Sequence, residues 1–194
     1  MRALLVPVKS FHEAKLRLSG VLDDHAREAL ARTLGAIVLG STPELATYVA
    51  CDDGEVADWA LGQGAFVLWT PGLGLSGAVR AGVAYLGEIG YALAVVAHAD
   101  LPFIVSLASF GNEGEVTLAP DRRLDGTNVA AVPTDADFGF SYGAGSFERH
   151  REEARRLGLT LQVVHDPRLG SDVDLPSDLD LLDGLVPLRE LGAP

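Results

Sequence analysis

The sequence predicts an α/β sandwich built around a mostly parallel sheet. Its 194 residues are 48% hydrophobic and 22% charged, proportions typical of one globular domain with a sizeable core. Short apolar runs alternate with segments of helical periodicity, as they do in α/β proteins. No repeat, low-complexity stretch or linker divides the chain. We therefore expect one domain over residues 1–183 and a loosely held tail over residues 184–194.

The apolar pattern places the individual elements. Strands are expected at residues 3–8, 46–51, 65–69, 91–97, 116–119, 128–132 and 161–164. Helices are expected at residues 26–39, 55–61, 75–86, 146–157 and 176–182. Asp23 and Asp24 stand where they can cap the first helix, and the run 91–97 should form a central strand buried on both faces. Ligands of such sheets bind beyond the carboxyl ends of the strands, so the residues that follow each strand are the candidates for function.

Composition excludes several classes of partner. Fifteen basic and 27 acidic residues give a net charge of −12, which argues against binding to nucleic acid or to an anionic membrane. The single cysteine, Cys51, cannot form an internal disulfide and is expected to be a small buried side chain. The longest apolar run is far shorter than the ~18 residues of a membrane span, and the N-terminal apolar stretch is too short for a signal peptide. We expect a soluble cytoplasmic protein; homo-oligomerisation is left open by the sequence.

Both lysines of the chain, Lys9 and Lys15, lie in the loop after the first strand, and Arg17 follows them closely. A lysine ammonium is a compact charge suited to a phosphate, and an acidic protein that binds a polyanion must concentrate positive charge locally. This loop does so. The alternative interpretation is a solvated loop whose lysines have no ligand.

The next two candidates follow the second and third strands. Asp52 and Asp53 can accept hydrogen bonds from a base or a ribose, although Asp53 is equally suited to capping the next helix. Gly74 and Ser76 lie in a glycine-rich turn before a helix, where backbone can approach a planar ligand and the hydroxyl can donate to it. Such turns are common, so the pattern alone favours no single interpretation.

A carboxylate stands at the end of the most apolar strand. Burying Asp100 there costs free energy unless it is paired or binds a metal. Asp172 and Asp174 are two residues apart and face the same way if that segment is extended. With Asp100 they can make the oxygen-rich site that magnesium prefers, whereas Asp174 can also cap the helix that begins at Pro176. His98 is interpreted as a packing or supporting histidine.

The last candidates precede a strand and a basic amphipathic helix. Thr127 lies in the segment that opens the strand, and Gly143, Gly145 and Ser146 open the helix. Backbone N–H groups that lack a partner at a helix start form a ready anion site. The alternative is an ordinary serine cap that follows a flexible loop.

Taken in chain order, these residues resemble one family, the CofC/FbiD guanylyltransferases of coenzyme F-420 biosynthesis. The resemblance runs from residue 3 to about residue 183. Its motifs are Pro7-Val8-Lys9, Lys15-Leu16-Arg17-Leu18, Asp52-Asp53, Ala99-Asp100-Leu101-Pro102, Gly126-Thr127-Asn128, Gly143-Ala144-Gly145-Ser146-Phe147 and Asp172-Val173-Asp174-Leu175-Pro176.

The resemblance implies a three-layer α/β/α nucleotidyltransferase fold. It also implies that GTP is joined to phosphoenolpyruvate or 2-phospho-L-lactate with release of pyrophosphate, and a bacterial source would favour phosphoenolpyruvate. The implied magnesium ligands are Asp100, Asp172 and Asp174. From the residue types and their positions after the strands we expect nucleotide contacts from Lys9, Lys15, Asp52, Asp53, Gly74 and Ser76. The implied pocket for the acid's carboxylate and phosphate contains Thr127, Gly143 and Ser146. We expect the catalytic residues to be Asp100, Lys15 and Arg17, with Lys15 and Arg17 holding the GTP phosphates.

The sequence departs from the family at two places. Ser76 stands where the family usually has asparagine, which puts the guanine contact there in question, and the segment Asp125-Gly126-Thr127-Asn128 is shorter than the family's pattern. Two other functions are alternatives to this one. A molybdenum-cofactor guanylyltransferase would carry a glycine-rich first loop, which this chain lacks. A non-catalytic nucleotide-binding regulator would have no need of the three aspartates and both lysines.

Overall fold

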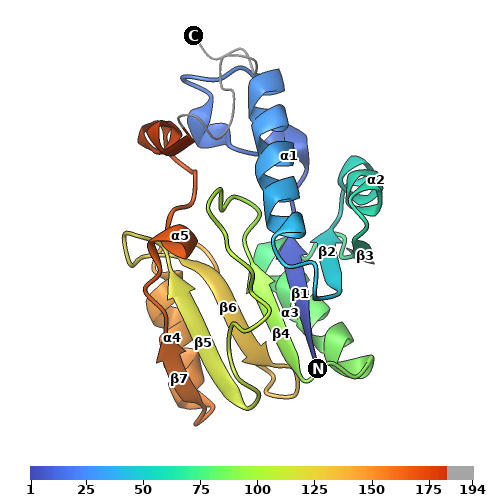
Figure 1. Ribbon diagram of the computed structural model, residues 1–194, viewed down its shortest axis with the longest axis vertical. Helices are drawn as coiled ribbons and strands as arrows, with labels where there is room; N and C mark the ends of the chain where they lie inside the picture. Colours follow the sequence, from blue (N-terminus) through green and yellow to red (C-terminus); the bar gives the residue numbers. More distant parts are fainter. Residues whose placement is uncertain (183–194) are drawn as a thin grey trace.

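The computed structural model describes residues 1–182, which form three layers: a seven-stranded sheet with helices on both faces (Figure 1). The three-layer α/β/α sandwich expected for the family is therefore confirmed. The predicted tail, residues 184–194, lies outside the described residues. Within residues 1–182 no helix combines the length and the apolar character needed to cross a membrane.

The sheet has the order β3-β2-β1-β4-β6-β5-β7, so β4 is its central strand as predicted. The strands are β1 (Arg2–Pro7), β2 (Thr47–Cys51), β3 (Phe66–Trp69), β4 (Leu93–Ala97), β5 (Glu115–Pro120), β6 (Thr127–Pro133) and β7 (Thr160–Val163). All neighbours pair in parallel except β6, which runs antiparallel to both β4 and β5. The prediction of a mostly parallel sheet is confirmed; the reversed direction of β6 was not predicted.

The helices lie close to their predicted positions. They are α1 (Asp24–Gly40), α2 (Gly54–Gly62), α3 (Gly74–Glu88), α4 (Ser146–Arg156) and α5 (Pro167–Gly170), with short 3₁₀ helices at Phe11–Glu13, Leu16–Leu18 and Pro176–Leu182. The Asp23 carboxylate accepts from the Ala26 N–H and caps α1. α5 and the first two 3₁₀ turns were not predicted from the sequence.

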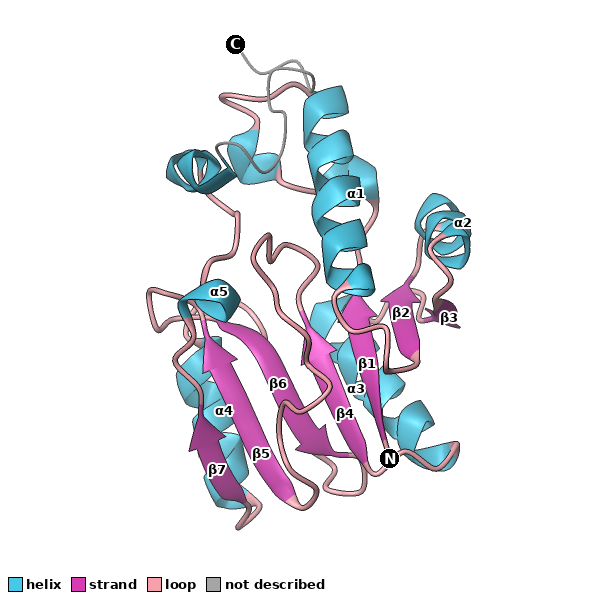
Figure 2. Ribbon diagram, in the orientation of Figure 1, coloured by secondary structure: helices cyan, strands magenta, loops and turns pink. Residues whose placement is uncertain are grey.

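Side chains that alternate along the strands form two cores, one on each face of the sheet. Leu4 and Val6 of β1 point to the face covered by α1 and α2, while Ala3 and Leu5 point to the face covered by α3 and α4. Figure 2 shows α3 and α4 behind the sheet and α1 in front of it. Burial on both faces explains why the central strands read as continuous apolar runs.

A third apolar cluster brings the two ends of the described chain together. Val173 and Leu182 pack against Leu18 and against the Leu30 and Leu34 side chains of α1. In addition, the Val173 N–H donates to the Asp100 carbonyl at 3.2 Å, beyond the end of β4. The segment that carries Asp172 and Asp174 therefore lies across the carboxyl edge of the sheet, beside the loop that follows β1.

Candidate active site

The centre of the candidate site is an ion pair between Lys15 and Asp100. The Lys15 ammonium donates to Asp100 Oδ2 and to the Val173 carbonyl, each at 2.6 Å. Burial by itself would raise the pKa of Asp100, but the charge and hydrogen bond of the adjacent Lys15 ammonium, together with the nearby His98, hold that pKa below its ordinary value. Asp100 Oδ1 is buried and has no hydrogen-bond partner among residues 1–182. The carboxylate is therefore ionised and retains capacity for one more positive group.

The backbone around Lys15 is unusual. Lys15 has a φ of 56°, in the left-handed region that non-glycine residues seldom occupy. The buried Arg27 of α1 donates to the carbonyl of the preceding residue, Ala14, at 2.6 Å and pairs with Asp24. The surrounding contacts thus hold Lys15 in a conformation that costs about 1–3 kcal/mol in an unsupported chain. The turn directs its side chain toward β4 rather than toward solvent.

The other two predicted carboxylates lie at the same edge. Asp172 accepts from the Asn128 amide at 3.3 Å, and both burial and the nearby Asp100 charge raise its pKa. Asp174 pairs with Arg17. No set of three His, Cys, Asp or Glu side chains in the described part of the chain is arranged to hold a metal ion as it stands. The structure brings the three carboxylates to one region, with two of them neutralised by Lys15 and Arg17.

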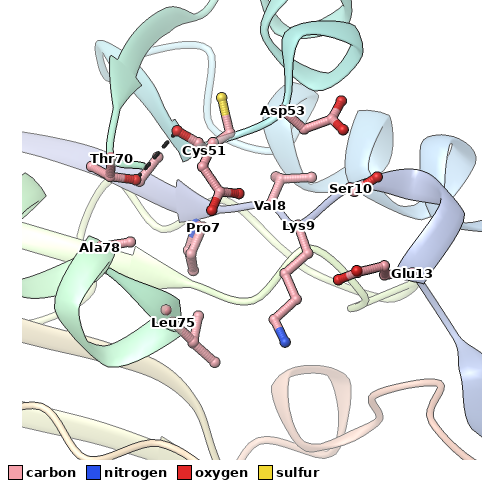
Figure 3. Close-up of a pocket in the computed structure, with 13 residues that line it drawn as sticks. Pro7, Val8, Lys9, Ser10, Glu13, Cys51, Asp53, Thr70, Leu75 and Ala78 are labelled. Atoms are coloured by element: carbon pink, nitrogen blue, oxygen red, sulfur yellow. Dashed lines mark hydrogen bonds between the residues drawn. The ribbon is translucent and has the colours of Figure 1, made fainter. Parts of the chain in front are cut away.

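Two adjoining cavities open at this edge of the sheet, and one of them lies beside the ion pair. The larger, of ≈ 340 Å³, lies between the ends of β1 and β2 and the start of α3, and the second, of ≈ 200 Å³, reaches Lys15, His98 and Asp100. Lys9 and Glu13 line both cavities. In Figure 3 the Lys9 side chain extends between Leu75 and the Glu13 carboxylate. A polyanionic ligand that spans both cavities would meet both lysines.

The predicted nucleotide contacts take different roles in the structure. Asp52 and Gly74 line the larger cavity, as does Asp53. The Asp53 carboxylate accepts from the Glu55 and Val56 N–H groups and so caps α2, which is the alternative that the sequence left open. Ser76 lies outside the lining of that cavity, and its hydroxyl accepts from the Tyr142 N–H at 2.9 Å. The contacts of these residues with a nucleotide stay a prediction.

The predicted acceptor pocket is internally hydrogen-bonded. Thr127 and Ser146 are 1% and 2% exposed; Ser146 Oγ accepts from the Thr127 N–H, and Thr127 Oγ1 bonds to His150 Nδ1. The expectation of a bare N–H at Gly145 is wrong, because that group donates to Asp125 Oδ1 at 2.9 Å. Gly143 is exposed, with a φ of 107° that favours glycine. Roles for Thr127, Gly143 and Ser146 in acid binding stay a prediction.

Three further side chains shape this site, and sequence reasoning missed two of them, Asp121 and Asp178. His98, interpreted from the sequence as a packing or supporting histidine, is half-buried and lies against Tyr142 with ring centroids 5.0 Å apart; burial of its ring lowers its pKa. Asp121 and Asp178 are buried carboxylates that organise loops at the same edge of the sheet. Asp121 directly follows β5, much as Asp100 comes shortly after β4. That position was the signal in the sequence that could have identified Asp121.

The family can now be identified by comparison. The family model described as guanylyl transferase CofC like matches residues 1–184. The chain belongs to the CofC-like guanylyl transferase family. It is 36% identical to a phosphoenolpyruvate guanylyltransferase of Sphaerobacter thermophilus, over 95% of this chain and 93% of that protein. It is also 35% identical to a 2-phospho-L-lactate guanylyltransferase of Halorubrum lacusprofundi, over 91% and 81% respectively.

Solved structures place this member of the CofC-like family among the nucleotidyltransferase folds. A Desulfovibrio desulfuricans protein assigned as a nucleotide-diphospho-sugar transferase superposes with a TM-score of 0.74, at 17% identity, over 98% of this chain and 97% of that one. A nucleotidyl transferase of Methanothermobacter gives a TM-score of 0.65 at 16% identity, over 98% and 99%. The predicted fold class is confirmed.

Proposed function

We propose that this protein transfers GMP from GTP to phosphoenolpyruvate with release of pyrophosphate, as a step in coenzyme F-420 biosynthesis. The single observation that carries the proposal is the Lys15 ammonium, held between Asp100 and the Val173 carbonyl in the lining of the smaller cavity. Membership of a guanylyltransferase family supports the nucleotide, and relatives named as phosphoenolpyruvate guanylyltransferases support the acceptor. The proposed reaction would take place in the cytoplasm, where GTP is available.

The chemistry needs no general base. An oxygen of the acceptor's phosphate attacks the α-phosphorus of GTP in line, the bond from that phosphorus to the β-phosphate oxygen breaks, and pyrophosphate leaves. The attacking oxygen is already anionic at neutral pH, so no proton has to be removed. Catalysis then rests on positioning and on neutralising charge, which is what Lys9, Lys15 and Arg17 offer at this edge of the sheet.

The ion pairs suggest how charge is redistributed when GTP binds. Lys15 and Arg17 neutralise Asp100 and Asp174 in the structure. Triphosphate oxygens entering the cavities would compete for both cations and leave the carboxylates with uncompensated charge. Asp100, Asp172 and Asp174 would then hold Mg²⁺, and the buried Asp100 Oδ1, which lacks a hydrogen-bond partner in the described chain, fits that role. Bound magnesium would supply electrostatic stabilisation of phosphate charge.

Two other assignments are separable by experiment. 2-Phospho-L-lactate is the second acceptor, and the relative from Halorubrum favours it. The second function is that of a regulator of the same fold that binds nucleotide without turnover. The Lys15–Asp100 ion pair speaks against it, because a protein that only binds nucleotide has no need of this pair.

Mass spectrometry of the products tests the proposal. The protein is incubated with GTP and Mg²⁺ together with phosphoenolpyruvate or 2-phospho-L-lactate, with ATP replacing GTP as the control. We expect a guanylylated phosphoenolpyruvate and one pyrophosphate for each GTP consumed. A product only with 2-phospho-L-lactate would change the acceptor, and GTP left unconsumed with both acids would contradict the proposed function.

A further inference from the structure

One loop contacts both halves of the candidate site. Residues 121–126 join β5 to β6 at the carboxyl edge and are organised from within by Asp121, which is 8% exposed. Asp121 Oδ1 accepts from the Arg123 and Asp125 N–H groups and Oδ2 accepts from the Gly126 N–H, all at 2.9 Å. A Cβ at Gly126 would lie 2.9 Å from Asp121 Oδ2, so this close approach requires glycine. These hydrogen bonds therefore hold the backbone of the loop in one conformation.

Two arginines of the loop reach the segment that carries Asp172 and Asp174, called the carboxylate segment below. Arg122 and Arg123 both pair with Asp178, whose side chain is fully buried. The second oxygen of Asp178 accepts from the backbone N–H groups of Asp174 and Leu175, at 3.0 and 2.9 Å. The backbone that carries Asp174 is thus fixed to the loop through one buried carboxylate.

The far end of the loop reaches the start of α4. Asp125 Oδ1 accepts from the Gly145 N–H at 2.9 Å, and the Asp125 carbonyl accepts from the Phe147 N–H at 3.0 Å. Gly145 has a φ of 71° and immediately precedes Ser146, the first residue of α4. The segment predicted to face the acceptor is therefore fixed to the same loop, through a different residue.

We propose that loop 121–126 positions the two segments independently, with Asp178 fixing residues 172–175 and Asp125 fixing residues 143–147. Both are positioning residues, because each acts through backbone N–H groups of the segments. Within residues 1–182, Asp178 makes no hydrogen bond or ion pair with the α4 start, and Asp125 makes none with the carboxylate segment. The kinetic test of this proposal rests on the proposed function, whereas the hydrogen-exchange test does not.

Amide hydrogen exchange tests the positioning directly. In Asp178→Asn the Asp174 and Leu175 amides should exchange about ten-fold faster, because their charged acceptor becomes neutral and loses its arginine partners. The Gly145 amide should be unchanged. Asp125→Ala should give the reverse pattern, about ten-fold faster exchange at Gly145 and no change at Asp174.

Two further variants keep the test decisive. Arg123→Met removes one partner of Asp178 at a partly exposed position. It should accelerate hydrogen exchange at the same two amides, and it takes the place of Asp178→Asn if that variant does not fold. Asp23→Ala removes the α1 cap elsewhere in the molecule and controls for a general loss of stability. Acceleration of both segments by either site variant, or of neither segment, would overturn the proposal.

The two variants should also differ in the kinetic constants that they change. Asp125→Ala should raise the KM for the acceptor about ten-fold and leave the KM for GTP unchanged. Asp178→Asn should lower kcat at limiting Mg²⁺, with recovery at excess Mg²⁺. The opposite assignment of the two effects would overturn the independence of the segments. If the wild-type protein released no pyrophosphate, the proposed function would fail, and the exchange pattern would still decide the positioning.

Discussion

The candidate site has two sides that differ in their polar groups. On the cavity side, formed by Lys15, His98 and Asp100, these groups are charged or, within residues 1–182, lack a hydrogen-bond partner. On the α4 side, Thr127 and Ser146 are neutral and belong to one hydrogen-bonded network. Asp100 Oδ1 and His98 Nε2 are buried without hydrogen-bond partners in the described chain. The Thr127 and Ser146 hydroxyls are both hydrogen-bonded.

This difference separates two kinds of binding surface. Charged groups such as Lys15 and Arg17 can exchange one anionic partner for another, so the cavity side is suited to receive phosphates. The α4 side already uses the Thr127 and Ser146 hydroxyls in hydrogen bonds within the protein. It can present backbone in a fixed position, and recognition there depends on preorganisation.

The largest expected effect is on the cavity side. Asp100→Asn keeps the shape of the side chain and removes its charge, so the Lys15 ammonium loses its counter-charge and the site loses an anionic ligand. We expect kcat to fall by about 100-fold or more, taking ~3 kcal/mol for one preorganised electrostatic group. Pyrophosphate release at saturating substrates measures it, with the exposed Asp137→Asn as control. Normal activity at limiting magnesium would contradict the assignment.

Lys15→Ala should impair use of the nucleotide. Removal of the ammonium takes away a charge-assisted contact worth about 1.5–3 kcal/mol, or roughly 10- to 150-fold in kcat/KM for GTP. The defect should persist at saturating acceptor. Titrations of GTP and acceptor performed separately decide the point. If only acceptor binding weakened, the loop after β1 would belong to the other substrate.

The α4 side should respond to pH through His150. Its Nε2 accepts from the Ser141 N–H, so the ring is neutral, and burial, with Arg149 and His98 nearby, lowers its pKa from 6.5 to about 4. The unfolded chain therefore binds the proton more tightly, and stability present above pH 6.5 is lost as the pH falls toward 4.

Between pH 7 and pH 5 this one group should remove about 2 kcal/mol from the free energy of unfolding. Denaturant titrations across that range measure the loss. His150→Gln should flatten the pH dependence, whereas the exposed His25→Gln should not. An equal slope in both variants would show that the α4 side does not depend on a neutral His150.

The smallest expected effect is that of Ser146→Ala. The buried Thr127 N–H loses its acceptor, which should lower stability by about 1 kcal/mol. Displacement of the α4 start should also raise the KM for the acceptor about ten-fold and leave GTP binding nearly intact. Ser41→Ala, which removes a hydroxyl at the end of α1, is the matched control. A selective loss of GTP affinity would show that nucleotide and acid are assigned to the wrong sides.

Much of the fold could be predicted because alternating apolar runs determine where strands and helices form. The strand at 93–97 was recognisable as central from its continuous apolar character, since both of its faces are buried. The direction of β6 was not predictable, because an apolar run fits a parallel and an antiparallel neighbour equally well. The turn α5 is only four residues long and leaves no periodic pattern.

The site was predictable where a charged residue closely follows a strand. Asp100 is such a residue, and Lys15 stood out because the chain has only two lysines. The pairing of Arg17 with Asp174 was not predictable, because 157 positions separate them and only the fold brings them together. Asp178 looked like an ordinary residue of the last helix, since nothing in the sequence shows that its carboxylate is buried.

The central claim is that the acceptor's own phosphate oxygen attacks the α-phosphorus of GTP. Phosphorus NMR of the product made from acceptor labelled with ¹⁸O in its phosphate tests this directly. We predict an isotope shift on both phosphorus atoms of the new bridge and no label in the released pyrophosphate. A shift confined to the acceptor's phosphorus, with none on the phosphorus derived from GTP, would show that another oxygen attacks and would contradict the account.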